Sequence, residues 1–202
     1  MPASTVPGRA EAGVDEAGRG PLAGPVVAAA VVLPPGLTHP LLRDSKQLTE
    51  AQRHEARAYI LEHALAWNIG MGSVAVIDRV NILQATLLAM QEALSGIPVP
   101  YQAVAVDGNR GFAWAVPVVP VVGGDGRYAH IAAASILAKT YRDELMVALA
   151  HDYPAYGWAQ NKGYPTAQHR AALAQHGPTP WHRRSYRLAG VQLPLITPAS
   201  GG

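Results

Sequence analysis

Acidic residues stand at the ends of three strand-like apolar runs, and glycine-rich backbone accompanies each of them. The pairings are Val14 before Asp15 and Glu16, Val106 before Asp107, and Val121-Val122 before Asp125. Strands that open into polar, glycine-rich turns predict a sheet with one polar edge, where the ends of adjacent strands converge. For any single aspartate, a turn-capping role is an equally good interpretation. Three such placements together favour a shared carboxylate site.

Apolar runs without a helical period predict five strands. They are expected on both sides of the first glycine-rich turn within residues 10–33, and over 65–71, 102–106 and 116–122. Pro117 and Pro120 lie in the last run. Proline cannot donate a ladder hydrogen bond and is therefore confined to sheet edges, so the last strand is expected at an edge.

Two helices are predicted between the second and fourth strands. Thr49 with Gln52 has the spacing of a capping box, which predicts a helix that ends at about His63. Asp78 is the expected N-cap of the next helix. Its buried face is expected to contain Val80, Leu83, Leu87, Met90 and Leu94, which recur at helical spacing.

A long helix is predicted over residues 131–149, and a short one over 166–175. The apolar stripe of the long helix comprises Ile131, Ala134, Ala138, Tyr141 and Leu145. Ser135, Lys139 and Arg142 fall on a single polar face, and Lys139 can pair with Asp143 one turn later. We expect Arg142 to have a structural role.

The distribution of charge is more informative than its total. All 14 acids of the 202-residue chain lie at or before Asp152, whereas residues 153–202 carry Lys162, Arg170, Arg183, Arg184 and Arg187. Such asymmetry favours contact with a polyanion, although a basic segment that only keeps the protein hydrated is an alternative. With no cysteine, disulfides and thiolate metal sites are excluded. No signal peptide or membrane span is apparent, so we expect a cytoplasmic protein without membrane contact.

Carboxylates that converge at a sheet edge need a cation. Several carboxylates at close range repel one another, and their pKa values rise unless positive charge neutralises them. Oxygen ligands without thiolates favour a hard ion, Mg²⁺ or Mn²⁺. Two such ions close together suit in-line displacement at a phosphodiester. The four acids Asp15, Glu16, Asp107 and Asp125 are therefore candidate metal ligands.

The motifs along the chain resemble those of ribonuclease H type 2, the bacterial ribonuclease HII family. In order, they are Asp15-Glu16-Ala17-Gly18-Arg19-Gly20-Pro21, Asp44-Ser45-Lys46, Asp78 with Asn81-Ile82-Leu83-Gln84-Ala85, Asp107-Gly108-Asn109, Gly124-Asp125, residues 131–139 with Arg142-Asp143, Asn161-Lys162-Gly163-Tyr164, and His182-Arg183-Arg184-Ser185-Tyr186. The resemblance spans about Gly13 to Tyr186.

This resemblance implies an α/β fold, with an RNase H-like mixed five-stranded sheet flanked by helices and a small helical C-terminal extension. Residues 1–152 would form the catalytic domain, 153–190 a basic substrate-binding part, and 191–202 a flexible tail. It also implies an Mn²⁺- or Mg²⁺-dependent endonuclease. Since the sequence shows no convincing oligomer interface, we expect a monomer. The enzyme would hydrolyse the RNA strand of RNA–DNA hybrids and incise duplex DNA at embedded ribonucleotides, leaving 3′-hydroxyl and 5′-phosphate ends.

Site residues carry over by motif. The resemblance implies that Asp15, Glu16, Asp107 and Asp125 are the catalytic, metal-binding carboxylates. It implies that Gly18-Arg19-Gly20 and Tyr164 sense the ribose 2′-hydroxyl. The remaining substrate-binding positions would be Lys46, Asn109, Ser135, Lys139, Arg183, Arg184 and Ser185.

The chain departs from the family pattern at a few positions. Gly123 stands where a lysine is usual, His130 replaces a serine, and Pro165 stands where glycine is common. Proline restricts the residue before it, so the position of Tyr164 is expected to be affected. The alternative function is a non-catalytic module that binds RNA–DNA hybrids. Four carboxylates that repel one another argue against it, because a binding module has no reason to hold them beside phosphates. Nucleotide binding by the glycine turn is weaker, because GxGxxG spacing is absent.

Overall fold

The computed structural model describes residues 10–188, and five strands within them form one mixed sheet. The strands are β1 (Glu11–Ala17), β2 (Val26–Val32), β3 (Ala66–Gly72), β4 (Ala103–Asp107) and β5 (Val118–Val121). Their order is β3-β2-β1-β4-β5. β1 runs antiparallel to β2 and parallel to β4, and β4 runs parallel to β5. The predicted strands and the edge position of the last one are confirmed.

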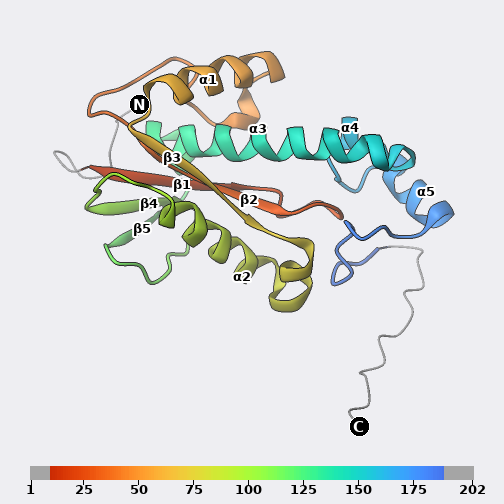
Figure 1. Cartoon of the computed structure of the whole chain (residues 1–202). Helices are drawn as coiled ribbons and strands as arrows, with labels where there is room; N and C mark the ends of the chain where they lie inside the picture. Colours follow the sequence, from red (N-terminus) through yellow and green to blue (C-terminus); the bar gives the residue numbers. More distant parts are fainter. Residues whose placement is uncertain (1–9, 189–202) are drawn as a thin grey trace, which may run out of the picture.

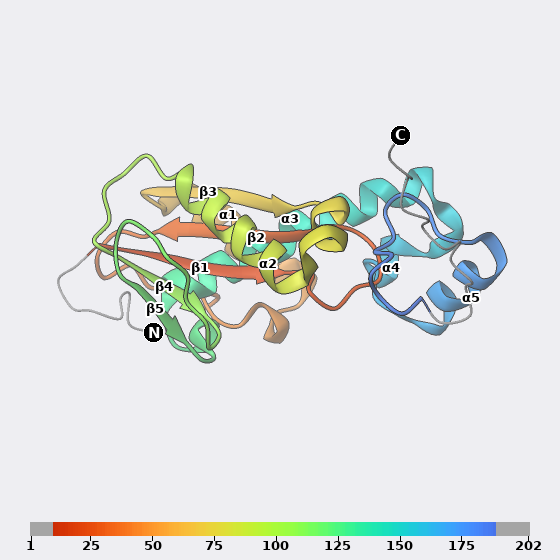
Figure 2. The same cartoon turned by 90° about the horizontal axis from the view of Figure 1, so that it is seen from below.

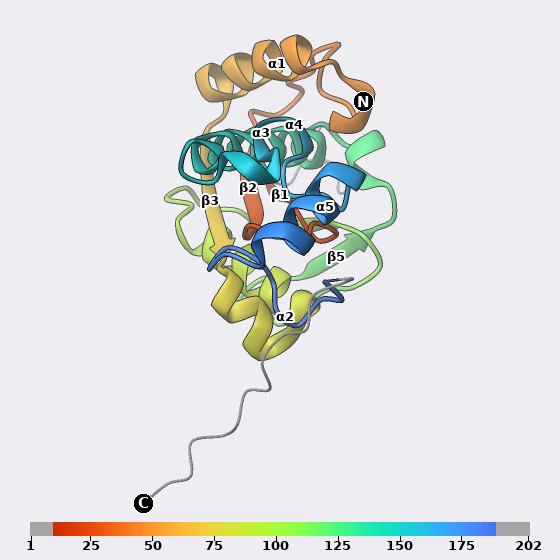
Figure 3. The same cartoon turned by 90° about the vertical axis from the view of Figure 1, so that its right-hand side faces the viewer.

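Helices cover both faces of the sheet, and further helices lie beyond one end of it. In chain order the helices are α1 (Glu50–His63), α2 (Val74–Ser95), α3 (Ala129–Asp152), α4 (Trp158–Asn161) and α5 (Ala167–His176), with 3₁₀ turns η1 (Ser45–Gln47), η2 (Gly124–Gly126) and η3 (Pro154–Tyr156). α1 and α3 lie on one side of the sheet and α2 lies on the other (Figures 1 and 3). α4 and α5 gather beyond one end of the sheet, near the end of α3 (Figure 2).

The central strands are apolar on both faces because helices cover both. Along β2, Val27, Ala29 and Val31 pack toward α1 and α3, whereas Ala28 and Ala30 pack toward α2. This alternation follows from the two-residue repeat of a strand. α3 approaches β1 so closely that a Cβ on Gly13 would lie 2.3 Å from the carbonyl carbon of His130.

The capping prediction for the first helix is confirmed. The Thr49 hydroxyl accepts a hydrogen bond from the Gln52 backbone N–H at 3.2 Å, and the Gln52 side chain accepts one from the Thr49 N–H at 3.0 Å. Two backbone donors at the helix start are thereby satisfied.

The N-cap prediction for α2 is wrong. Ser73, not Asp78, caps the helix by accepting a hydrogen bond from the Val76 N–H. The helix then kinks at Asn81, whose φ is 72°, and the Asn81 side chain accepts a hydrogen bond from the Gln84 N–H. Of the predicted buried face, Met90 and Leu94 are buried, whereas Val80, Leu83 and Leu87 are half-buried. Ser73 and Asp78 are both residue types that can cap a helix, and the local sequence does not show which of them does so.

The expected apolar stripe of α3 is confirmed except at Tyr141, and its last member, Leu145, is half-buried against the core cluster that follows. Ile131, Ala134 and Ala138 are buried, but Tyr141 is 39% exposed. In the second half the buried positions are Arg142, Met146 and Leu149. Here α3 has passed the sheet and packs against Leu22, Tyr156 and Trp158, which cover a different side of the helix.

Residues after α3 share a core with the rest of the chain. Trp158, Leu173 and Leu188 pack with Leu22 and Met146 in one cluster. Residues 191–202, expected to be a flexible tail, lie outside the described residues, as do 189–190. Among residues 10–188, no helix has the length and hydropathy that a membrane span needs. The domain division, cytoplasmic location and monomeric state stay predictions.

Candidate active site

Three carboxylates meet at the edge of the sheet where β1, β4 and β5 end. Asp15 lies in β1, Asp107 ends β4, and Asp125 lies in η2 just after β5. One carboxylate oxygen from each residue lies within 4.8 Å of the others. They converge because the three strands are parallel neighbours, with Val14 beside Val106 and Asp107 beside Val121.

Backbone donors hold two of these carboxylates. Asp15 Oδ1 accepts a hydrogen bond from the Glu16 N–H at 2.7 Å, and Asp107 Oδ1 accepts one from the Gly124 N–H at 2.7 Å. The second bond joins the end of β4 to the turn that carries Asp125. The relative position of the carboxylates is therefore built into the backbone.

Glu16 lies beside this group without joining it. Neighbouring side chains on a strand point to opposite faces. Its carboxylate pairs with Arg19 at 3.3 Å and lines the same cleft as Asp15 and Asp107. Glu16 also lines an adjoining hollow together with Asn109 and Arg110, so it borders both the cleft and the hollow.

The electrostatics of the group favour a bound cation. Burial raises the pKa of Asp15 well above its usual value, and the charges of Glu16 and Asp107 raise it further. Burial also raises the pKa of Glu16 and of Asp125. The three ligand atoms that lie close together are all carboxylate oxygens, which are the ligands that hard divalent ions prefer. The donor set fits Mg²⁺ or Mn²⁺.

A buried arginine holds the glycine turn. The fully buried guanidinium of Arg183 donates to the carbonyl oxygens of Gly18, Arg19, Gly24 and Pro25. The expectation that Arg183 contacts the substrate backbone is therefore corrected, because its donors are occupied inside the protein. Sequence motifs cannot distinguish a basic residue that meets solvent from one that is buried.

A second buried arginine lies under the same turn. Arg142 is 1% exposed and donates to the carbonyl oxygens of Ala23, Pro25 and Lys162, in agreement with the structural role expected for it. Gly18 has a φ of 96°, and a Cβ there would lie 2.1 Å from Arg142 Nε. Glycine is required at this position for both reasons.

Several other predicted site residues line the same cleft, which has a volume of about 370 Å³. These residues are Gly20, Lys46, Ser135, Lys139 and Tyr164. The polar face predicted for α3 therefore borders the cleft. Tyr164 is 41% exposed, and Lys139 Nζ lies 5.9 Å from its ring centre. The predicted pair of Lys139 with Asp143 is confirmed at 2.9 Å.

Lys46 brings positive charge to the carboxylates from another segment. Its Nζ lies 3.6 Å from Asp125 and 3.8 Å from Asp44. Gly123, where the resemblance leads us to expect a lysine, lies two residues before Asp125. Asp44 is not among the predicted site residues, yet its charge raises the pKa of Asp125. Its position in the Asp44-Ser45-Lys46 motif is the sequence feature that could have pointed to it.

The remaining candidates lie outside the cleft. The Asp78 carboxylate accepts hydrogen bonds from the backbone N–H groups of Arg184 and Ser185, and from the Ser185 hydroxyl at 2.6 Å. Asp78 thus ties the C-terminal segment to α2. His130 does not line the cleft, and its buried ring lies 3.5 Å from Glu11.

Comparison with known proteins agrees with this geometry. The model of the family "Ribonuclease HII" matches residues 12–189. The chain belongs to the ribonuclease HII family. It is 54% identical over 181 residues to the ribonuclease HII of Bacteroides thetaiotaomicron, covering 89% of this chain and 90% of that protein. It is 52% identical over 196 residues to that of Dechloromonas aromatica, covering 97% and 100%.

Solved structures share the fold. The ribonuclease H2 of Pyrococcus horikoshii superposes with a TM-score of 0.74 at 27% identity, covering 89% of this chain and 95% of that chain. As a member of the ribonuclease HII family, the chain is a metal-dependent endoribonuclease that acts on RNA–DNA hybrids. The RNase H-like fold expected from the motifs is confirmed.

Proposed function

We propose that this enzyme incises duplex DNA at single embedded ribonucleotides as well as within longer hybrids, by two-metal-ion hydrolysis. The observation that carries the proposal is the make-up of one cleft. Asp15, Glu16 and Asp107 line it together with the Gly18-Arg19-Gly20 turn and Tyr164. Groups suited to recognise a ribose therefore lie beside groups suited to bind metal.

Recognition of one ribonucleotide requires contact with its 2′-hydroxyl, which is both donor and acceptor and distinguishes RNA from DNA. Gly20 carries no Cβ, so the backbone of the turn can approach a sugar closely there. The Tyr164 ring stands next to Gly20, where a Cβ would lie 3.7 Å from the ring. A partly exposed tyrosine offers an apolar face to the sugar and a hydroxyl for one hydrogen bond.

We propose that Asp15, Glu16, Asp107 and Asp125 hold two Mn²⁺ or Mg²⁺ ions. Bound there, the ions would activate a water for attack and offset the charge on the leaving 3′ oxygen. The protein places the carboxylates in advance, through the backbone hydrogen bonds to Asp15 and Asp107. Lys46 keeps a positive charge beside Asp125.

Basic and polar groups around the cleft suit a nucleic-acid backbone. The cleft is lined by Lys46, Ser135 and Lys139, and the adjoining hollow by Asn109. Arg184 and Ser185 are exposed on the segment that Asp78 holds. Phosphate contacts of this kind position a duplex without reading its sequence.

Cleavage mapping on a DNA duplex with one ribonucleotide tests the proposal. We expect wild-type enzyme with Mn²⁺ or Mg²⁺ to cut once, at the ribonucleotide, leaving 3′-hydroxyl and 5′-phosphate ends. Asp107→Asn should abolish cleavage and keep duplex binding. Asp152→Asn, an exposed acid-to-amide change at the end of α3, is the matched control and should retain full activity.

The alternative to an endonuclease is a protein that binds RNA–DNA hybrids without cutting them, and cleavage mapping distinguishes the two. Such a protein would bind the duplex without any metal-dependent product. Full activity of Asp107→Asn would refute the carboxylate assignment, and cleavage confined to long hybrids would refute incision at single ribonucleotides.

A further inference from the structure

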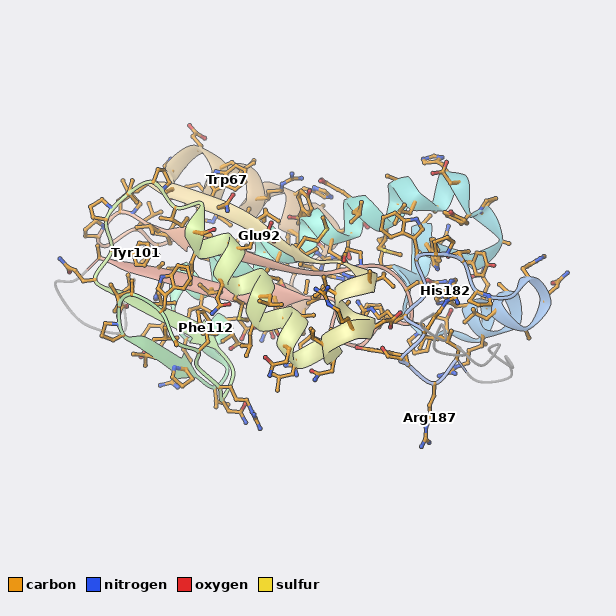
Figure 4. The ribbon with its side chains drawn as sticks, turned by 60° about the horizontal axis from the view of Figure 1, so that its bottom comes forward. Trp67, Glu92, Tyr101, Phe112, His182 and Arg187 are labelled. Carbon is orange, nitrogen blue, oxygen red and sulfur yellow. The ribbon has the colours of Figure 1, made fainter. Side chains whose placement is uncertain are left out.

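A buried chain of polar side chains lies behind Tyr164, in the part of the molecule that follows α3. Trp158, His169 and His182 are each at most 1% exposed. Trp158 Nε1 lies 3.1 Å from His169 Nε2, which lies 3.0 Å from His182 Nε2. Figure 4 shows His182 within this C-terminal part, at the opposite end of the sheet from Tyr101.

Only one arrangement of protons satisfies this chain. His169 Nδ1 lies 2.9 Å from the Tyr164 carbonyl oxygen, which can only accept, so Nδ1 carries the proton. The indole N–H of Trp158 can only donate, so His169 Nε2 is an acceptor. His169 is therefore the neutral Nδ1–H tautomer.

The same reasoning determines the state of His182. The backbone N–H of Thr179 donates to His182 Nδ1 at 2.9 Å, so Nδ1 is an acceptor. His182 Nε2 faces an acceptor on His169 and must carry the proton. Burial and the neighbouring His169 lower the pKa of His182 to about 4, and burial lowers the pKa of His169. Both rings are thus neutral near pH 7.

One end of this chain of hydrogen bonds reaches the Tyr164 backbone, and the other reaches the backbone that follows the glycine turn. At one end, the Tyr164 carbonyl accepts from His169 and also from the Thr166 N–H at 2.8 Å. At the other end, the backbone of His182 pairs with Ala23, which follows the glycine turn. The Leu22 N–H donates to the Gly163 carbonyl at 2.9 Å and closes the connection.

We propose that His169 and His182 are positioning residues, which form a neutral hydrogen-bond relay that holds the Tyr164 backbone in register with the Gly18-Arg19-Gly20 turn. Neither ring lines the cleft, so both act through Tyr164. The relay matters for Tyr164 because, among the described residues, its carbonyl oxygen has two donors, the Thr166 N–H and the His169 ring. The inference rests on the proposed recognition of single ribonucleotides.

Two substitutions at His169 separate positioning from stability. In His169→Asn, the amide N–H₂ takes the place of Nδ1–H and can still donate to Tyr164, but Trp158 and His182 lose their acceptor. In His169→Gln, the amide oxygen takes the place of Nε2 and can accept from both, but the donor to Tyr164 is lost. His169→Asn leaves two buried donors unsatisfied and should have the lower Tm.

The relay predicts that the variant with the higher Tm, His169→Gln, is the one that loses substrate specificity. We expect His169→Gln to lower kcat/KM on the single-ribonucleotide duplex about five- to tenfold relative to a long hybrid, the effect of one lost hydrogen bond. His169→Asn should keep the wild-type ratio between the two substrates. If the ratio falls equally in both variants, or falls only with Tm, the positioning role is overturned.

A measurement on the wild-type protein needs neither variant nor substrate. Long-range ¹H–¹⁵N NMR at neutral pH distinguishes imidazole tautomers. We expect one histidine as the neutral Nδ1–H tautomer and another as Nε2–H, assigned by their loss in His169→Gln and His182→Gln. If these variants do not fold, assignment through ring-to-backbone correlations replaces them. A charged His169, or one protonated at Nε2, would overturn the relay, whereas failure of wild type to cut the duplex would refute only the proposed function.

Discussion

The buried guanidinium of Arg183 donates a hydrogen bond to the carbonyl oxygen of Arg19 at 3.0 Å. The two residues are 164 positions apart in the chain. Further bonds from Arg183 reach the carbonyl oxygens of Gly18 and Gly24, so one side chain near the C-terminus determines the shape of the first glycine turn. A turn expected to contact substrate is therefore held in place by a segment from the other end of the chain.

Replacing this arginine should weaken both the fold and the turn. Lysine cannot reproduce the planar set of donors, so Arg183→Lys leaves buried carbonyl oxygens unsatisfied. We expect the free energy of unfolding to fall by about 3 kcal/mol and Tm by about 6–12 °C. Thermal unfolding measures this. Arg184→Lys, at the exposed neighbouring side chain, is the control and should leave Tm unchanged.

Divalent ions should stabilise the protein more at pH 8 than at pH 5. The pKa values of Asp15, Glu16 and Asp125 are raised in the folded state, mainly by burial. Folded protein thus binds more protons than unfolded protein, and stability falls as pH rises from about 4 through the raised values. A bound cation replaces those protons and offsets the loss of stability that ionised, buried carboxylates cause.

Thermal unfolding with and without Mn²⁺ or Mg²⁺ at the two pH values checks this prediction. At a hundredfold excess of ion over Kd, the gain is about 2.7 kcal/mol, or about 5–11 °C in Tm. Asp107→Asn should reduce the gain. An equal shift at both pH values would contradict the proposed link between the ions and the buried carboxylates.

The contact between β1 and α3 should tolerate no added methyl group. A Cβ at Gly13 would lie 2.3–2.6 Å from backbone atoms of His130 and Ile131, which cannot rotate away. We expect Gly13→Ala to destabilise the protein by about 3 kcal/mol, measured by urea unfolding. Gly126→Ala, where a Cβ would meet nothing within 4 Å, should have little effect. Similar stability of the two variants would show that α3 can shift.

Tyr164 should matter more for single ribonucleotides than for long hybrids. A single embedded ribonucleotide presents one 2′-hydroxyl, whereas a long hybrid offers many registers for productive binding. We expect Tyr164→Ala to lower kcat/KM about tenfold on the former and less on the latter. Tyr164→Phe keeps the ring and separates stacking from the hydroxyl contact. An equal loss on both substrates would count against a sensing role for Tyr164.

The sequence already indicated most of the secondary structure and the core of the site. Local signals were sufficient for the capping box at Thr49 and for the edge strand with Pro117 and Pro120, because each depends on residues close together in the chain. They failed at Asp78, which binds the backbone of residues 184–185 in place of a helix start. They also failed at Tyr141, because the neighbours of α3 change along its length.

The order of residues is enough to place acids and glycines at strand ends and turns, within the family motifs around them. Which of these residues meet depends on how distant segments pack. Parallel pairing of β1, β4 and β5 brings Asp15, Asp107 and Asp125 together, while Glu16 lies to one side with Arg19. Packing of the C-terminal part buries Arg183 and the two histidines. The physical reason is that burial and convergence depend on contacts between distant segments, which no local pattern of residues contains.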